Sequence, residues 1–297
     1  MLTSQDATES ESAAQQSPAF LRSFELYRVD SSGMVIAMTV DSEFKGYAED
    51  VAYHGQPIIV SDRDSLPHDI AALLVFPVYR GGDVVSMVAF AASSRDEAVG
   101  VFEIWEPVGL YDDVRLANGY YPNLERFQNI STFVRFEKGF GLPGQVWQRQ
   151  RAMVQDDLAN HPGFLRAAGA SADSLCIGVG IPVCDDSFVA AVVLLSSQRT
   201  PLARGFEVWL PTGKGFELLE SSYAAEEAEY ALLPGTTLDA DEGLPAMSAR
   251  EEAACVSRQR AVYAPRREAI GGSKIHCGVA IPCYDGVTLT SVVVMLF

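Results

Sequence analysis

The sequence contains few of the residues that build disulfide frameworks or metal sites, and it has no long apolar run. Its 297 residues include five cysteines and four histidines. An odd number of cysteines without a Cys-x-x-Cys spacing predicts reduced thiols and argues against a disulfide scaffold or a zinc knuckle. No window reaches the roughly 18–20 uninterrupted apolar residues of a membrane-spanning helix. Residues 1–17 also lack the basic and then apolar pattern of a signal peptide. We therefore expect a cytoplasmic protein that is not embedded in a membrane.

Basic residues are also scarce. The chain has 22 Lys and Arg against 39 Asp and Glu, which gives a formal charge of −17. Such an acidic protein repels phosphate backbones and anionic lipid headgroups, so we expect no nucleic-acid partner. With 48% hydrophobic residues, the chain is long enough for two or three domains that each bury a core.

Two short phrases each occur three times along the chain, which indicates an internal repeat. The first is Phe-Glu, an aliphatic residue and Tyr or Trp, at residues 24–27, 102–105 and 206–209. The second places proline in an apolar run, at residues 76–78, 181–183 and 281–283. A polar turn and another apolar run follow each proline, which predicts a β-hairpin. We expect a disordered tail at residues 1–19, then repeats at 20–96, 100–198 and 204–297.

Between the two phrases, each repeat is expected to contain strand, strand, helix, strand and helix before its hairpin. Gly-Leu-Pro-Gly at 141–144 predicts a helix start in the second repeat. Gly-Leu-Pro-Ala at 243–246 predicts a longer helix in the third, running to Arg258 and followed by a strand at 259–263. The first repeat is shorter, and we expect it to lack about one helix and a loop.

The second repeat resembles a GAF domain. The resemblance rests on Gly-Phe-Gly-Leu-Pro-Gly-Gln-Val-Trp at 139–147, Met-Val-Gln-Asp-Asp-Leu at 153–158 and Gly-Val-Gly-Ile-Pro-Val at 178–183. It extends over most of the chain and weakens from the second repeat to the third and then to the first. It implies an α+β fold of three tandem GAF-like modules, the first truncated. Each module would be a mainly antiparallel sheet flanked by helices, with a small-molecule pocket on one face.

The resemblance implies a non-catalytic sensory or ligand-binding protein that acts on a separate signalling partner. The short linkers between repeats do not fit the long helices that join signalling GAF domains to an effector, and no output domain is expected in this chain. A protein-interaction scaffold with degenerate pockets is the alternative. A GAF-type free methionine sulfoxide reductase is a minor alternative, because Pro143 stands where that resemblance requires a nucleophilic thiol. The cofactor and the ligand are unknown, and a homodimer is compatible with the sequence.

Five residues are candidate ligand contacts: Phe133, Phe136, Trp147, Cys176 and His276. The three aromatic residues lie near the Gly-Leu-Pro-Gly segment, where they would either line a pocket or pack the sheet against a helix. Cys176 and His276 each lie six residues before a repeated proline. A haem or metal ligand at these positions would need converging partners that the sequence does not offer, so no metal site is expected. Arg-Gln-Arg at 149–151 and 258–260 is interpreted as a helix end, with an anion site as the alternative.

Overall fold

The computed structural model describes residues 19–39, 42–109, 111–265 and 273–297. The expected disordered tail at 1–19 lies outside these ranges except for Ala19. Within them, no helix is long and apolar enough to cross a membrane.

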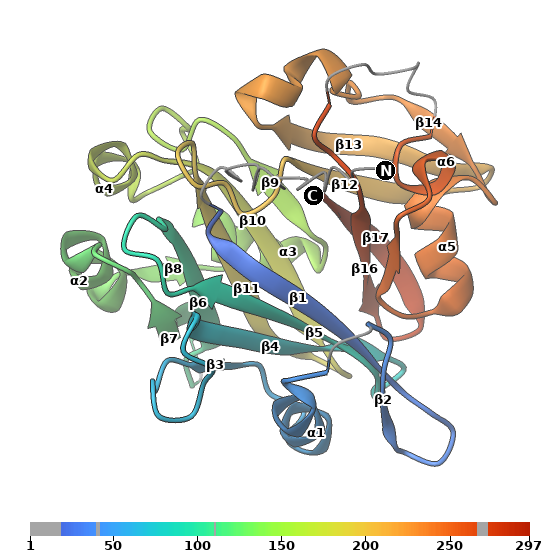
Figure 1. Cartoon of the computed structure of the whole chain (residues 1–297), viewed down its shortest axis with the longest axis horizontal. Helices are drawn as coiled ribbons and strands as arrows, with labels where there is room; N and C mark the ends of the chain where they lie inside the picture. The colour runs from blue at the N-terminus through green and yellow to red at the C-terminus, as the bar shows by residue number, and fades with distance from the viewer. Residues whose placement is uncertain (1–18, 40–41, 110, 266–272) are drawn as a thin grey trace, which may run out of the picture.

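The strands form three antiparallel sheets with corresponding strand orders (Figure 1). Sheet 1 has the order β2-β1-β5-β4-β3, sheet 2 the order β8-β7-β6-β11-β10-β9, and sheet 3 the order β14-β13-β12-β17-β16-β15. Sheet 1 has one strand fewer, at the edge where β8 and β14 lie in the other sheets. The strands of sheet 1 are β1 Leu21–Val29, β2 Val35–Ala37, β3 Ile58–Val60, β4 Ile70–Arg80 and β5 Asp83–Ser93. Those of sheet 2 are β6 Gly100–Pro107, β7 Asp113–Tyr120, β8 Arg135–Glu137, β9 Met153–Gln155, β10 Leu175–Cys184 and β11 Phe188–Ser197. Those of sheet 3 are β12 Gly205–Thr212, β13 Gly215–Tyr223, β14 Thr237–Asp239, β15 Cys255–Ser257, β16 Gly278–Asp285 and β17 Thr288–Leu296.

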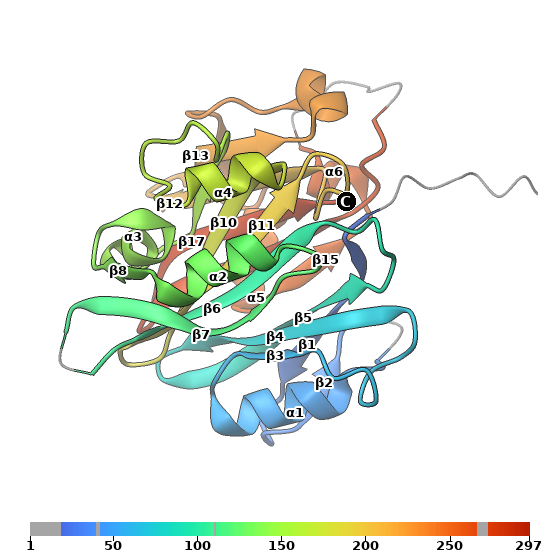
Figure 2. The same cartoon turned by 90° about the vertical axis from the view of Figure 1, so that its left-hand side faces the viewer.

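The helices cover the outer faces of the sheets, as the two views in Figures 1 and 2 show. Helix α1 (Lys45–His54) packs on sheet 1, and α2 (Glu125–Phe133), α3 (Gly141–Arg149) and α4 (Ala167–Ala172) pack on sheet 2. Sheet 3 carries α5 (Gly243–Glu251), α6 (Arg260–Tyr263) and the 3₁₀ helix η1 (Ala225–Tyr230). The expectation of a mainly antiparallel α+β fold is confirmed.

The inner faces of the three sheets meet in one central core. Along β5, alternate side chains point to opposite faces, so Val88 and Phe90 enter this core while Met87 and Ala89 pack towards α1. The two strands of each closing hairpin are therefore apolar on both faces. Burial on both sides accounts for the continuous apolar runs, where a strand with one wet face would alternate.

The repeated prolines occupy corresponding places in the three sheets. Pro77 pairs with Met87, Pro182 with Ala191 and Pro282 with Val292. On the other side of each proline the short edge strand does not extend far enough to pair with it; β3, for example, begins at Ile58, which lies opposite Val75. No neighbouring strand there needs the missing N–H, which is why proline fits.

A serine hydroxyl links the sheets at two of their three junctions. Ser291 Oγ on β17 accepts a hydrogen bond of 3.0 Å from the backbone N–H of Ala152, just before edge strand β9. Ser86 Oγ on β5 accepts one of 3.0 Å from Ala254 N–H, just before β15. The corresponding residues of the third junction are Ala190 and Pro57, by their strand pairings. Ala190 has no hydroxyl to accept a hydrogen bond and Pro57 has no N–H to donate one, so this hydrogen bond cannot form there.

Replacing Ser291 with alanine is expected to lower the free energy of unfolding by about 1–3 kcal/mol, because a buried N–H loses its acceptor. Chemical denaturation of the full chain measures this change. The matched control is Ala190→Ser, which should give no stabilisation, since the corresponding donor position holds a proline. An unchanged denaturation midpoint for Ser291→Ala would show that this hydrogen bond does not hold the junction.

The expected long helix in the third repeat is wrong. Helix α5 ends at Glu251, and Glu252 adopts a left-handed conformation at φ 55°. Strand β15 follows, and residues 260–263 form α6 in place of the expected strand. Residues 248–254 are good helix formers, which favours a longer helix locally. Pairing of Cys255–Ser257 with β16 prevails over that preference.

Candidate functional site

Each repeated Phe-Glu phrase places a buried glutamate inside a sheet. Glu25, Glu103 and Glu207 are all at most 3% exposed. Each accepts a hydrogen bond from the aromatic side chain two residues further along its strand: the Tyr27 hydroxyl, Trp105 Nε1 or Trp209 Nε1. The sequence did carry a signal for these buried acceptors, since a glutamate recurs at the same place in three apolar strands. No role was assigned to them in the sequence analysis.

In sheet 2 this glutamate forms a buried ion pair with Arg166, which lies just before α4. Arg166 Nη2 donates to Glu103 Oε2 at 2.9 Å, and Nη1 donates to the other carboxylate oxygen. Ser131 Oγ on α2 accepts a further bond from Nη1 at 2.6 Å, and Tyr121 donates its hydroxyl to Glu103 at 2.8 Å. Burial raises the pKa of the Tyr121 hydroxyl, and the negative charge of Glu103 raises it further by a smaller amount. The phenol therefore stays protonated as a donor.

Four aromatic rings enclose the Arg166 guanidinium at 4.7–5.7 Å from its Cζ: Trp105, Phe127, Phe136 and Phe164. The rings come from sheet 2, α2, and the loop before α4, which Figure 2 shows over the outer face of the sheet. Cation–π attraction and the carboxylate together stabilise a charge that no water reaches. The space between sheet 2 and these helices is thus filled by a side chain of the protein.

The three aromatic candidates in the second repeat do not converge on one space. Phe136 belongs to the enclosure of Arg166. Phe133, at the end of α2, is 85% exposed. Trp147 on α3 stacks on Phe188 with ring centroids 5.4 Å apart.

Cys176 and His276 occupy corresponding positions, as their spacing from the prolines predicts, but their surroundings differ. Cys176 is half-buried against the central core, and its thiol donates to the carbonyl of Ser196 at 3.3 Å. Burial raises the pKa of this thiol to about 11. His276 is exposed and lines a groove between sheets 1 and 3.

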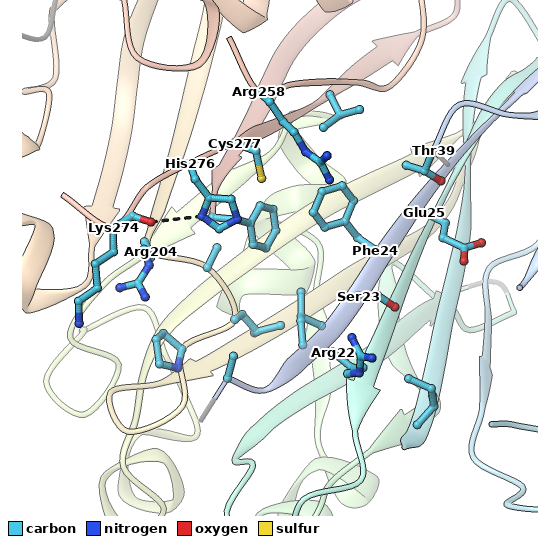
Figure 3. A pocket seen from close by; sticks show the side chains of 18 of the residues that line it. Arg22, Ser23, Phe24, Glu25, Thr39, Arg204, Arg258, Lys274, His276 and Cys277 are labelled. Atoms are coloured by element: carbon cyan, nitrogen blue, oxygen red, sulfur yellow. Dashed lines mark hydrogen bonds between the residues drawn. The ribbon is translucent and has the colours of Figure 1, made fainter. Parts of the chain in front are cut away.

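The groove has a volume of about 1140 Å³ and is drawn in Figure 3. One wall comes from β1 and the residues after β2, including Phe24 and Met38. The opposite wall comes from sheet 3, with Val256, His276 and Phe297. The segment 198–204, which joins sheet 2 to sheet 3, closes one end.

The groove opens where one junction differs from the other two. Between sheets 1 and 2, Asn118 Nδ2 donates to the carbonyl of Ile59 at 3.1 Å. Between sheets 2 and 3, Glu220 Oε2 accepts from Val154 N–H at 2.7 Å. The corresponding residues between sheets 3 and 1 are Val256 and Met38, and both line the groove. A methionine side chain offers no strong donor or acceptor at this place, so sheets 3 and 1 are joined further along by the Ser86–Ala254 hydrogen bond.

Positive charge gathers in the groove of this acidic protein. Two of its cations are paired: Arg22 Nε lies 2.7 Å from Asp69 Oδ2, and Arg204 Nη1 lies 3.2 Å from Glu226 Oε1. Three others, Arg199, Arg258 and Lys274, also line it. Within the part of the chain that the structure describes, these three make no ion pair. The groove therefore offers cationic groups that are free to meet an anion.

A stacked aromatic pair lines the same groove. The rings of Phe24 and Phe297 are 4.9 Å apart between centroids and inclined by 28°. Both side chains are partly exposed in the groove. The counterparts of Phe24 in the other two repeated phrases, Phe102 and Phe206, are fully buried. The open junction thus exposes a ring that the other sheets cover.

Within the described ranges, no group of three or more His, Cys, Asp or Glu side chains is placed to hold a metal ion. All five cysteines are free thiols. Burial raises the pKa of Cys184, Cys255 and Cys283 to about 12 in each case. These thiols pack as small apolar side chains.

Sequence reasoning found only part of the groove. It proposed His276, and it named Arg258 within an Arg-Gln-Arg phrase that had an anion site as its alternative. Arg199 and Lys274 lie in connecting segments without a repeated pattern, so no sequence signal pointed to them. The groove also lies between two repeats, whereas the expected pocket lay within one.

No family model and no curated protein matches this chain. Several solved structures match part of this chain. One is the GAF domain of Nlh2 from A. aeolicus in an inactive state, with 20% identity, 34% of this chain and 59% of that chain covered, and a TM-score of 0.28. A free methionine-R-sulfoxide reductase from Neisseria meningitidis in complex with its substrate has 17% identity, coverage of 34% and 53%, and a TM-score of 0.26. A mutated NreA protein from Staphylococcus aureus, altered in its nitrate-binding site, has 16% identity, coverage of 36% and 81%, and a TM-score of 0.29. The chain spans somewhat more than half the length of the first two, and these neighbours include a GAF domain.

Proposed function

We propose that this chain is a non-catalytic ligand-binding protein built from three GAF-like modules, and that its ligand binds in the groove between sheets 1 and 3. The observation that carries the proposal is the partly exposed Phe24–Phe297 pair, which lines the same groove as three unpaired cations in a protein of formal charge −17. Small-molecule sites combine apolar and aromatic walls with a few placed polar groups, and the groove has this composition.

A sensory role follows from where the groove lies. Its two walls belong to different sheets, so a bound molecule that contacts both would favour one separation of sheets 1 and 3 over others. A ligand shifts such an equilibrium only by its difference in affinity for the two arrangements. Contacts with both walls provide that difference, and a separate partner protein would detect the resulting arrangement.

The non-catalytic part of the proposal rests on the chemistry of the lining. Cys277, the thiol in the groove, has its pKa raised by burial, which disfavours the nucleophilic thiolate. Pro143, at the position where the resemblance to a methionine sulfoxide reductase requires a thiol, lies buried in the first turn of α3. We therefore propose binding without turnover.

The second candidate function is the protein-interaction scaffold with degenerate pockets. It is favoured by Arg166, which fills the space beneath the helices of sheet 2 and leaves no room for a ligand at that place. The open groove favours the ligand-binding function over it.

A screen of small metabolites by thermal shift, followed by calorimetry on the full chain, tests the ligand-binding function. Ser23 lines the groove, and Ser23→Trp should abolish binding of any compound found because the indole occupies the groove. The matched control is Trp147→Ala on α3, which should leave affinity unchanged below its melting range. A compound that still binds Ser23→Trp but no longer binds Trp147→Ala would place the site in the second module and refute the groove assignment.

A further inference from the structure

Resting on the proposed function, we infer that the ligand of the groove is a planar ring joined to an anionic group, a carboxylate or a phosphate. The feature that points to this class is the position of the free cations relative to the exposed rings. Arg258, Phe24 and His276 extend into the same space from opposite walls (Figure 3).

The ring part of the ligand is argued from the aromatic pair. Phe24 and Phe297 already stack on each other, and each keeps an exposed surface towards the groove. Leu21, Met38 and Val256 add apolar surface on both walls. A third ring in offset or edge contact with this pair would continue the same geometry, since aromatic rings prefer centroid separations of roughly 4.5–7 Å.

The anionic part is argued from the charges that face the groove. The lining contains four acidic residues, but Asp69 and Glu226 are paired with Arg22 and Arg204. Glu25 is buried and accepts bonds from the Tyr27 hydroxyl and from the N–H groups of Glu43 and Phe44. Glu43 is the one remaining acid among the described lining residues, against the three cations Arg199, Arg258 and Lys274. The excess charge in the groove is therefore positive.

The types of cation suit an oxyanion. The planar guanidinium of Arg258 presents a pair of donors that matches two oxygens of a carboxylate or a phosphate. Lys274 adds a point charge from the same wall. His276 Nδ1 lies 3.2 Å from the carbonyl of Lys274, so Nε2 is the ring nitrogen left to meet a polar group of the ligand.

The volume fits a molecule with both parts. At about 1140 Å³, the groove is slightly larger than the roughly 300–1,000 Å³ of ordinary small-molecule sites. A free inorganic anion would contact the cations and leave the rings uncovered. A neutral aromatic compound would cover the rings and leave three charges without a partner. Only a ligand with both groups uses both features.

The test is calorimetry on the full chain with four probes: phenyl phosphate, benzoate, inorganic phosphate and benzyl alcohol. We expect phenyl phosphate or benzoate, which combine a ring with an anionic group, to bind at least about tenfold more tightly than inorganic phosphate or benzyl alcohol, which each offer only one of the two. Comparing phenyl phosphate with benzoate distinguishes phosphate from carboxylate recognition. Affinity for the preferred probe should fall about tenfold in Arg258→Gln and in Phe24→Leu, and it should weaken with added salt. The matched controls are Arg115→Gln on β7 and Tyr53→Leu on α1, both exposed outside the groove, which should change nothing.

Three outcomes overturn the inference. If a neutral compound from the metabolite screen binds in the groove, with binding lost in Ser23→Trp, while neither anionic aromatic probe binds, then the ligand class is wrong and the proposed function stands. If no compound of any kind depends on the groove, the proposed function fails, and the inference fails with it. Equal binding of phenyl phosphate to wild type, Arg258→Gln and Phe24→Leu also refutes the inference.

Discussion

Replacing Arg166 with methionine is expected to lower the free energy of unfolding by about 3–5 kcal/mol, because Glu103 would then remain buried without its cation. Both side chains of this pair are 0% exposed, and four rings exclude water from the guanidinium. Methionine fills much of the same volume, so the loss reports the charge and its hydrogen bonds more than a cavity. Denaturant titration followed by tryptophan fluorescence measures it, since Trp105 lies within the enclosure.

Two further variants separate the ion pair from a general packing defect. Glu103→Gln combined with Arg166→Met removes both charges, and we expect it to recover most of the lost stability. Arg22→Met, which removes an exposed arginine paired with the exposed Asp69, should cost less than about 1 kcal/mol. If Arg166→Met were no more destabilising than Arg22→Met, the buried pair would not stabilise the packing of sheet 2 against its helices.

Truncating Phe206 to alanine is expected to lower the free energy of unfolding by about 3–5 kcal/mol, because the ring is fully buried in the core shared by the three sheets. Phe102→Ala should cost a similar amount. Phe24→Ala, at the corresponding place in the first phrase, should cost clearly less, since its ring is partly exposed in the groove. The three variants thus share one chemical change and differ in burial.

Thermal and chemical unfolding of the three variants, measured side by side, test this order. A loss for Phe24→Ala as large as that for Phe206→Ala would mean that the junction of sheets 1 and 3 is closed in solution. In that case the groove would not be open to a ligand.

The sequence predicted the sheets well because their signals are local. The repeated phrase around Phe102 and the proline at 182 each mark one strand of a sheet, and the polar turns mark the hairpins. The long helix predicted up to Arg258 failed for the opposite reason. Pairing of β15 with β16 joins residues about 25 positions apart, and local helix propensity carries no information on it.

The candidate site was harder to predict because it depends on how the repeats meet. Arg166 and Glu103 are 63 residues apart in the chain, so no short motif links them. The groove needs sheets 1 and 3, the first and last in the chain, to face each other. Phe136 and Trp147 were proposed from their nearness to the Gly-Leu-Pro-Gly segment, a distance along the chain that does not measure convergence in space.

The three junctions also differ in how the backbone crosses them. Residues 94–99 connect sheet 1 to sheet 2, and residues 198–204 connect sheet 2 to sheet 3. Each short connection keeps the two sheets that it joins close together, which raises the effective concentration of one sheet near the other. Among the described residues, no such connection joins sheet 3 directly to sheet 1, and this is the junction that opens as the groove. The junction of sheets 1 and 3 therefore depends on side-chain contacts, such as the Ser86–Ala254 hydrogen bond and the Arg80–Glu252 ion pair. A molecule that contacts both walls of the groove would add a further link at this junction, which no connecting segment of the described chain crosses.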